Sequence, residues 1–420
     1  MLVSPARACG VDFGTSNSTV GHLRPRAETL LALEDGRVTL PSAVFFNIDE
    51  NSTHFGRDAM AQYLDGYEGR LVRSLKSLLG SALIDAHTEV GGRALSFRAL
   101  LATFIGELKR RAELAAGRSF DCAVFGRPVF FVDGKPDADK LAEDTLAEIA
   151  HSVGFRELSF QFEPIGAAFH YERTLAREEL VLIADIGGGT ADFSLVRLSP
   201  ERAKHDERRE DLLANGGVHI GGTDFDRALN LASAMPLLGM GSRTLNGAEL
   251  PSQIFYQLAT WHTIPFAYTR AAWADVQQLF RMSAEREKLD RLSRLIDRRS
   301  GHWLALQVEQ AKIELSASDQ ARLDLGELQV GLAADISRSD FAAATDSLVS
   351  EVGATVLELL KQANIAAAQV DTIFFTGGGS GVPQLRQAIS AILPEARACE
   401  GDLFGSIGAG LAVEAFRRYG

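Results

Sequence analysis

The residues Val181–Leu195 read VLIADIGGGTADFSL. A run of apolar residues leads into an aspartate, three glycines and a threonine, and a second apolar run follows at once. This order is typical of a buried strand, a tight turn with an open backbone, and a returning strand. A second stretch, Gly10–Val20, reads GVDFGTSNSTV and repeats the order apolar, Asp, apolar, Gly before a threonine-bearing turn. We therefore expect two structurally similar halves, beginning near residues 8 and 180.

The rest of the chain alternates between strand and helix patterns. Cys122–Val132 is rich in Val and Phe, as strands are, and Asp137–Val153 carries apolar residues on one helical face. Ser339–Ala363 again has helical spacing, and Val370–Phe375 forms a strand pattern before a third glycine turn. Residues 235–307 hold all three tryptophans and lack a strand pattern, so we expect a mostly helical insertion there. The alternation predicts an α/β fold.

Composition excludes several classes of function. The chain has 420 residues, 46% of them hydrophobic, and a formal charge of −12, which would repel a nucleic-acid backbone. Acids and bases alternate in the run Glu201–Asp211, which predicts an exposed loop. No stretch of about 18 uncharged apolar residues occurs and no signal region opens the chain, so we expect no membrane contact and a cytoplasmic location. Cys9, Cys122 and Cys399 lack paired spacing and are expected to be buried free thiols.

The first two glycine turns provide the groups that a polyphosphate and its magnesium ion require. Such a ligand needs close backbone N–H groups, hydroxyl donors, and carboxylates that organise the water shell of the metal. The first turn offers Gly14, Thr15, Ser16 and Asn17, and the second offers Gly187, Gly188, Gly189 and Thr190. Asp12 and Asp185 at the strand ends would face a hydrated Mg²⁺, and Asp192 flanks the second turn. In a single turn such residues can serve turn geometry alone, but two matching turns favour phosphate binding.

The third turn, Thr376–Pro383, contains three consecutive glycines that leave room for a flat ring or a ribose. A glycine-rich connection without any ligand is the alternative for this turn alone. The P-loop pattern is absent, and no Gly-x-Gly-x-x-Gly opens a helix after the first strand. A P-loop or dinucleotide-binding enzyme is therefore disfavoured.

These motifs resemble those of the DnaK-type heat-shock chaperones, within the superfamily that includes actin and sugar kinases. The segments that carry the resemblance are Asp12–Ser18, Glu163–Ala168, Asp185–Asp192, Asn215–Asp226, Glu309–Ser316 and Gly377–Gly379. They span nearly the whole chain, and the overall pattern resembles the truncated YegD-like branch. The resemblance implies a two-lobed actin-like ATPase fold of duplicated ribonuclease-H-like domains. The lobes would be residues 1–178 and 179–420, with the helical insertion at 227–308.

The resemblance also implies binding of ATP or ADP with Mg²⁺ and hydrolysis of ATP by an in-line water. Lys76 would neutralise charge on the γ-phosphoryl oxygens, and Glu163 would orient the water. Thr190 and Asp192 would lie near the γ-phosphate, and Asp12 and Asp185 would hold the metal through water. The other implied nucleotide contacts are Gly221, Gly222, Glu309, Lys312, Ser316, Gly377, Gly378, Gly379 and Asp402, while Pro128 matches the proline of the family's interdomain switch. By local pattern alone, Lys76 would be a solvated helix lysine, Glu163 a helix-start carboxylate, and Glu309 and Lys312 an ordinary helical ion pair.

The chain also departs from the family's pattern. It stops at Gly420, so we expect no built-in peptide-binding domain. Gly381 and Ile313 occupy positions where some members place adenine-stacking arginines, which predicts weaker affinity or looser base selectivity. The implied function is a slow, chaperone-like ATPase whose lobe closure is coupled to an unknown protein partner. The alternatives are a nucleotide-gated scaffold with negligible turnover, an actin-like filament protein, or a small-molecule kinase.

Overall fold

The computed structural model of the protein describes residues 7–24, 29–80, 84–90, 92–132, 135–205, 207–401 and 405–420. Contacts divide the chain into two compact units. Unit 1 comprises Met1–Val218, Thr355–Ser380 and Ile389–Gly420, and unit 2 comprises His219–Ala354 and Gly381–Ala388. The boundary between lobes that we expect at residue 178 remains a prediction.

Unit 1 contains two five-stranded sheets with the same strand order. The first sheet is β10 (Glu157–Phe162), β9 (Cys122–Arg127), β1 (Ala8–Phe13), β2 (Asn17–Gly21) and β3 (Thr39–Pro41). The second is β17 (Arg397–Glu400), β16 (Thr372–Thr376), β11 (Glu179–Ile186), β12 (Ala191–Leu198) and β13 (Leu212–Val218). In each sheet the central strand pairs antiparallel with the strand after its glycine turn and parallel with its other neighbour. The predictions of an α/β fold and of two similar halves are therefore confirmed.

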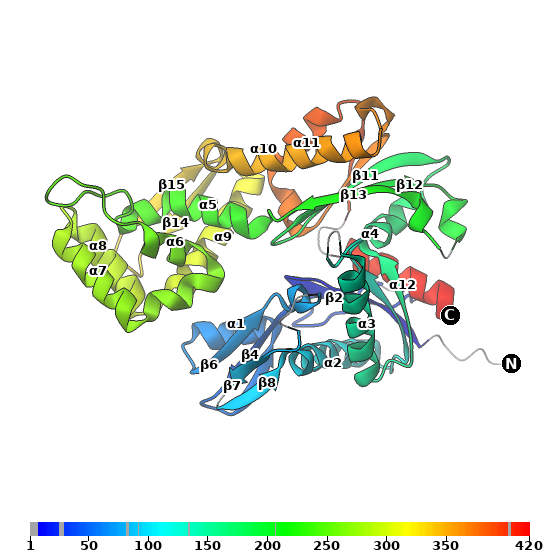
Figure 1. Ribbon diagram of the computed structural model, residues 1–420, viewed down its shortest axis with the longest axis horizontal. Helices are drawn as coiled ribbons and strands as arrows, with labels where there is room; N and C mark the ends of the chain where they lie inside the picture. The colour runs from blue at the N-terminus through cyan, green and yellow to red at the C-terminus, as the bar shows by residue number, and fades with distance from the viewer. Residues whose placement is uncertain are drawn as a thin grey trace. The chain divides into compact units, whose positions relative to one another are not determined.

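The helices follow these strands in the same chain order in both halves. The first half has α2 (Phe97–Ala116), α3 (Pro136–Ser152) and α4 (Glu163–Glu172), and the second has α10 (Arg338–Gln362), α11 (Pro383–Ile392) and α12 (Ser406–Tyr419) (Figure 1). Ser96 caps α2 by accepting a hydrogen bond from Ala99 N at 3.2 Å, and Gly117, at φ +66°, ends it. Pro136 at the first turn of α3 explains where that helix begins.

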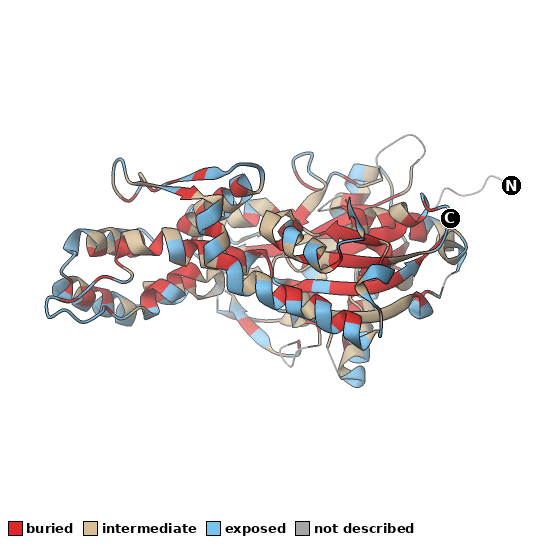
Figure 2. Ribbon diagram, turned by 90° about the horizontal axis from the view of Figure 1, so that it is seen from above, coloured by how far each residue is buried: buried red, intermediate tan, exposed pale blue. Residues whose placement is uncertain are grey.

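The core of unit 1 lies where helices cover the sheets. Large aromatic residues such as Phe13, Phe104 and Phe125 are fully buried in it. Figure 2 shows buried residues along the strands and on the inner faces of the helices. A smaller part of unit 1 is formed by β4 (Ala43–Asn47), β5 (Ser52–Phe55), α1 (Gly56–Leu64), β6 (Gly69–Arg73), η1 (Leu75–Leu78), β7 (His87–Val90) and β8 (Arg93–Ser96).

Glycines let α12 approach its neighbours closely. A Cβ on Gly10 of β1 would overlap the backbone of Leu411 and Ala412. Where α12 crosses α4, a Cβ on Gly410 would overlap the carbonyl oxygen of Gly166. The backbones of α4 and α12 therefore touch at this crossing, with no side chain between them.

Unit 2 is mostly helical, as the sequence predicts for residues 235–307. Its elements are α5 (Gly222–Ser233), η4 (Met235–Leu238), α6 (Gln253–Ala259), η5 (Trp261–Tyr268), α7 (Arg270–Met282), α8 (Arg286–Asp297), α9 (Gly301–Ala317), the hairpin of β14 (Gln320–Asp324) and β15 (Ala333–Ser337), and the start of α10. Leu289, Leu292, Leu295 and Ile296 recur at helical spacing in α8 and are buried. Among the described residues, no helix is long and apolar enough to cross a membrane.

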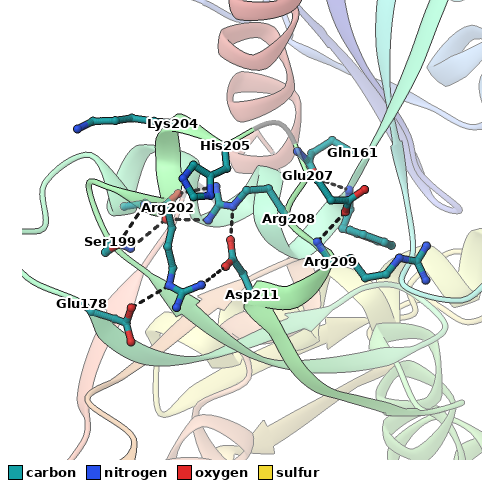
Figure 3. A network of polar contacts seen from close by, with 12 residues as sticks. Gln161, Glu178, Ser199, Arg202, Lys204, His205, Glu207, Arg208, Arg209 and Asp211 are labelled. Carbon is teal, nitrogen blue, oxygen red and sulfur yellow. Dashed lines mark hydrogen bonds and ion pairs between the residues drawn. The ribbon is translucent and has the colours of Figure 1, made fainter.

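Two sequence expectations are wrong. The run Glu201–Asp211 is not simply an exposed loop, because Arg208 and Asp211 are 2% and 5% exposed and form ion pairs (Figure 3). Burial there follows from contacts with residues distant in the sequence. All three cysteines are free, but only Cys9 is fully buried.

Candidate functional site

Two aspartates occupy the same position in two hairpins of unit 1. Asp12 of β1 faces Thr19 of β2, and Asp185 of β11 faces Asp192 of β12. Each cross-strand pair is therefore separated by a turn of the same length. Both hairpins place a carboxylate at a strand end beside a glycine turn.

The two glycine turns meet directly. A Cβ on Gly188 would lie 2.2 Å from the hydroxyl oxygen of Ser16, so a larger residue at this position would force the Ser16 side chain to move. Ser42 fixes the backbone of the first turn with two hydrogen bonds. Its hydroxyl donates to Gly14 O at 2.7 Å, and its N–H donates to Ser16 O at 2.9 Å. The predicted phosphate-binding residues Gly14–Asn17 and Gly187–Thr190 are all partly or fully exposed. The structure thus brings both predicted phosphate turns together, and it adds Ser42, which the sequence pattern did not single out.

The third glycine turn packs on the second. Gly377 has φ +79°, and a Cβ there would lie 2.6 Å from Asp185 Oδ1 and also overlap Ile186 O. A Cβ on Gly379 would lie 2.7 Å from Ile186 Cγ2 and 2.9 Å from Gly187 O. Any side chain at these two positions would displace the strand end that carries Asp185.

Lys76 and Glu163 form an ion pair at this site. Lys76 is the second residue of η1, which follows Ser74 at φ +56°, and Glu163 is the first residue of α4. Both side chains are only 12% exposed. A Cβ on Gly126, near the end of β9, would lie 3.1 Å from Glu163 Cγ, so this glycine leaves the space that the carboxylate occupies. The interpretation of Lys76 as a solvated helix lysine is wrong.

The charges of the site are strongly coupled. Burial raises the pKa of Asp12 to about 7, with a further rise from Glu163, and Lys76 opposes both. Burial also raises the pKa of Asp185 to about 8, and Asp192 and Glu163 add to the rise. Burial would lower the pKa of Lys76, but Glu163, Asp12 and Asp185 outweigh it and raise that pKa. One ammonium group thus faces a concentration of negative charge.

This coupling predicts how the stability of the metal-free protein depends on pH. In the folded chain Asp12 and Asp185 bind protons more tightly than in the unfolded chain, where aspartates titrate near about pH 4. Their stabilising contribution is therefore complete below about pH 4 and is lost as the pH rises to about 8. We expect Asp185→Asn to flatten this decline, so that at about pH 8.5 the variant unfolds at a higher temperature than the wild type.

Thermal unfolding at several pH values, without metal or nucleotide, checks this expectation. Each tenfold difference in proton affinity corresponds to about 1.4 kcal/mol. Asp144, which is exposed on α3, offers the control, because Asp144→Asn removes one carboxylate without removing a buried one. Parallel pH profiles for the wild type and Asp185→Asn would contradict the assignment of the decline to Asp185.

Of the residues predicted to contact adenosine, Gly221, Gly222, Glu309, Lys312 and Ser316 lie in unit 2, and Gly377–Gly379 lie in unit 1. Lys312 of α9 pairs with Asp226 Oδ1 of α5 at 2.7 Å and donates to Gly222 O at 3.2 Å. Burial raises the pKa of Asp226 to about 6, although Lys312 lowers it. A Cβ on Gly381 would lie 4.0 Å from Ser316 Oγ. Within unit 2, helix α9 thus presents Lys312 to Asp226 of α5 and Ser316 to Gly381.

The sequence predicts several further residues of the site without predicting their contacts. Asp226 lies within a segment that carries the family resemblance, yet no local signal marks it as the partner of Lys312. Gly221 caps α5, with its N–H donating to Asp224 Oδ2 at 3.0 Å. Thr190 donates its hydroxyl to Asp192 Oδ2 at 2.8 Å, which fixes both side chains of the second turn. Asp402 lies outside the described residues.

Known proteins share this sequence pattern. A family model described as "Hsp70 protein" matches residues 84–233 and 278–411. Three curated relatives, from Methylobacillus flagellatus, Laribacter hongkongensis and Burkholderia multivorans, are each named "Chaperone protein HscA homolog". They are 26%, 26% and 27% identical over 97%, 91% and 91% of this chain, and the matches cover 57%, 54% and 54% of the relatives. The chain therefore spans little more than half the length of these relatives.

Proposed function

Because the chain belongs to the Hsp70 family, we propose that it binds MgATP and slowly hydrolyses ATP to ADP and phosphate as a chaperone-like protein. It has the α/β actin-like nucleotide-binding fold of this family. The observation that carries the proposal is the buried Lys76–Glu163 pair beside Asp12 and Asp185. A nucleotide-binding protein without chemistry has no evident need for a buried lysine among several carboxylates, because desolvating such charges is costly.

The two facing turns would hold the phosphates. Backbone groups of Gly14–Asn17 and Gly187–Thr190 would approach the phosphate oxygens closely, because glycine removes side chains where the turns meet. Asp12 and Asp185 fit a hydrated Mg²⁺, since burial and neighbouring carboxylates raise their pKa values and a divalent cation nearby would favour the ionised form of both. Among the described residues, no three acidic, His or Cys side chains are grouped closely enough to hold a metal directly. The carboxylates would therefore act through the metal's water shell, and the ion, when bound, would neutralise charge on the phosphates.

The chemical step would depend on positioning and charge. Glu163 would accept a hydrogen bond from the attacking water and orient its lone pair toward the γ-phosphorus. Lys76 would donate to the γ-phosphoryl oxygens as the new P–O bond forms and the bond to the β-phosphate oxygen breaks. Thr190, already oriented by Asp192, would contact the same phosphoryl group. The proton of the water would pass to the released phosphate or to solvent.

The proposal also assigns the contacts to adenosine and a protein partner. Glu309, Lys312 and Ser316 of α9, with Gly221 and Gly222, would serve the adenosine, and Gly377, Gly378 and Gly379 would leave room for it. Ile313 is 54% exposed and cannot stack as an arginine would, so we propose loose base selectivity. Closure around the nucleotide would be passed to a protein partner, which the chaperone names of the relatives support.

The test is phosphate release from purified protein under single-turnover conditions, together with a nucleotide titration. We expect slow, Mg²⁺-dependent release by the wild type. Asp185→Ala should weaken MgATP binding at least about tenfold, since it removes one of the two carboxylates proposed to face the metal's water shell. Asp144→Ala should behave like the wild type.

Three other outcomes would overturn the proposal. Tight binding without release would indicate a nucleotide-gated scaffold. Release that needs an acceptor molecule would indicate a kinase, and pelleting with ATP at high speed would indicate a filament protein.

A further inference from the structure

The segment Ser199–Asp211 of unit 1 joins two crossing helices. It connects β12 to β13, and its described residues contact both α4 and α12 on one side of their crossing point at Gly166 and Gly410. The sequence alone predicts only an exposed charged loop here.

The contact with α4 is a buried ion pair. Glu172, the last residue of α4, accepts from Arg208 Nη1 at 3.0 Å, from Arg208 Nη2 at 2.8 Å and from Ser199 N at 3.0 Å. The side chains of Arg208 and Glu172 are 2% and 1% exposed. Arg208 Nε also donates to Asp211, whose other oxygen accepts from Arg202 at 2.5 Å (Figure 3). A bidentate, fully buried pair of this kind fixes both distance and orientation.

The contact with α12 uses the main chain of the same segment. Arg417 donates to Lys204 O at 3.0 Å and to His205 O at 3.1 Å. Arg417 is itself held by Glu414, a buried residue of α12, at 2.7 Å. The segment therefore acts as a strut between the two helices, beyond the point where their backbones touch.

Helix geometry relates this strut to the catalytic end of α4. Glu163 and Glu172 lie on opposite sides of the crossing at Gly166, about 4.5 Å and 9 Å from it along the axis at 1.5 Å per residue. If α4 tilts about that contact, a shift of about 2 Å at Glu172 moves Glu163 by about 1 Å. An error of about 1 Å in a reacting group can cost a hundredfold in rate.

We propose that Arg208 is a positioning residue for the hydrolytic site: by holding Glu172 it fixes the tilt of α4 and thereby the place of Glu163. This inference rests on the proposed ATPase function. Arg208 touches neither Glu163 nor Lys76, so its effect passes through the helix.

The test replaces the Glu172–Arg208 ion pair with residues that should leave the protein folded. In Glu172→Met/Arg208→Met, apolar residues of similar length fill the space, an exchange that is often neutral for stability, and Asp211 keeps Arg202. The matched control is Glu34→Met/Arg57→Met, which removes another buried carboxylate and one arginine partner, neither of them in α4 or α12, while Arg111 keeps Glu107. The conservative variant Glu172→Gln keeps an acceptor for Ser199 N and Arg208.

We expect the first double variant to release phosphate at least about tenfold more slowly, with a Kd for MgADP within about threefold of the wild type. The control and Glu172→Gln should keep the wild-type rate within about threefold. Hydrogen exchange gives a second readout that needs no hydrolysis. The amides of Ala167–Phe169 in α4, whose hydrogen bonds are made to the first turn of the helix, should exchange at least about tenfold faster in the first double variant only.

Equal slowing in the control variant, or an unchanged rate in Glu172→Met/Arg208→Met, would overturn the inference. If the wild type releases no phosphate, the proposed function fails and hydrogen exchange alone decides about the strut. Faster exchange of Ala167–Phe169 would then support it, and unchanged exchange would refute it.

Discussion

Lys76→Ala is expected to slow single-turnover phosphate release by about two to three orders of magnitude, the usual cost of removing a group that stabilises transition-state charge. The ammonium of Lys76 pairs with Glu163, and it also opposes the raised pKa values of Asp12 and Asp185. The Kd for MgADP should change by less than about threefold, because ADP lacks the γ-phosphoryl group that Lys76 would contact. Single-turnover release and an ADP titration on the same preparation measure both effects.

The control for this variant is Lys140→Ala, which removes a lysine that is 64% exposed on α3. Glu163→Gln should slow release to a similar degree, and the double variant Lys76→Ala/Glu163→Gln should lose little more, because the two residues act as one unit. Additive losses would show that the two groups act independently. An unchanged rate in Lys76→Ala would remove Lys76 from the site.

Gly10→Ala is expected to destabilise the protein by at least about 3 kcal/mol, more than most overpacked substitutions. The added methyl group would lie 2.7 Å from Leu411 Cβ and would overlap the backbone of Leu411 and Ala412. Neither β1, in the centre of its sheet, nor α12 can move without disturbing the other. Denaturant unfolding measures the effect.

Gly106→Ala provides the matched comparison. Gly106 lies inside α2, and a Cβ there would meet Val153 Cγ1 at 3.6 Å, an ordinary contact. Alanine is the better helix former, so this variant should gain about 0.5 to 1 kcal/mol. If Gly10→Ala did not lower the free energy of unfolding relative to Gly106→Ala, the close packing of α12 on β1 would be contradicted.

Local patterns were sufficient to predict the two hairpins. The apolar run, the aspartate at the strand end and the glycine turn are all contained within about a dozen residues, and the same register recurs at Asp12 and Asp185. The helical character of residues 235–307 was equally local, since α8 buries its apolar residues at helical spacing. The roles given to these residues at the nucleotide remain predictions.

Contacts between distant segments could not be predicted in this way. Lys76 is buried because Glu163 lies beside it, 87 residues later, and the local pattern alone suggests a solvated lysine. Arg208 is buried because Glu172 needs a partner, 36 residues earlier, whereas its charged neighbours suggest an exposed loop. The family resemblance supplied Lys76 but not Arg208, and neither route identified Asp226 as the partner of Lys312.

The repeated sheet order has a consequence for the ancestry of the molecule. A half-length ancestor with one such hairpin would form a two-fold symmetric pair, the commonest way for identical chains to associate. Such a pair would present equal charges from both subunits and could not distinguish the attacked phosphorus from the leaving group. Gene fusion allows the copies to diverge, and here Thr19 stands in the first hairpin where Asp192 stands in the second. The single chain is thereby free to place different side chains at matching positions of its two hairpins. At the proposed nucleotide site, this difference would give the two sides of the ligand different charges.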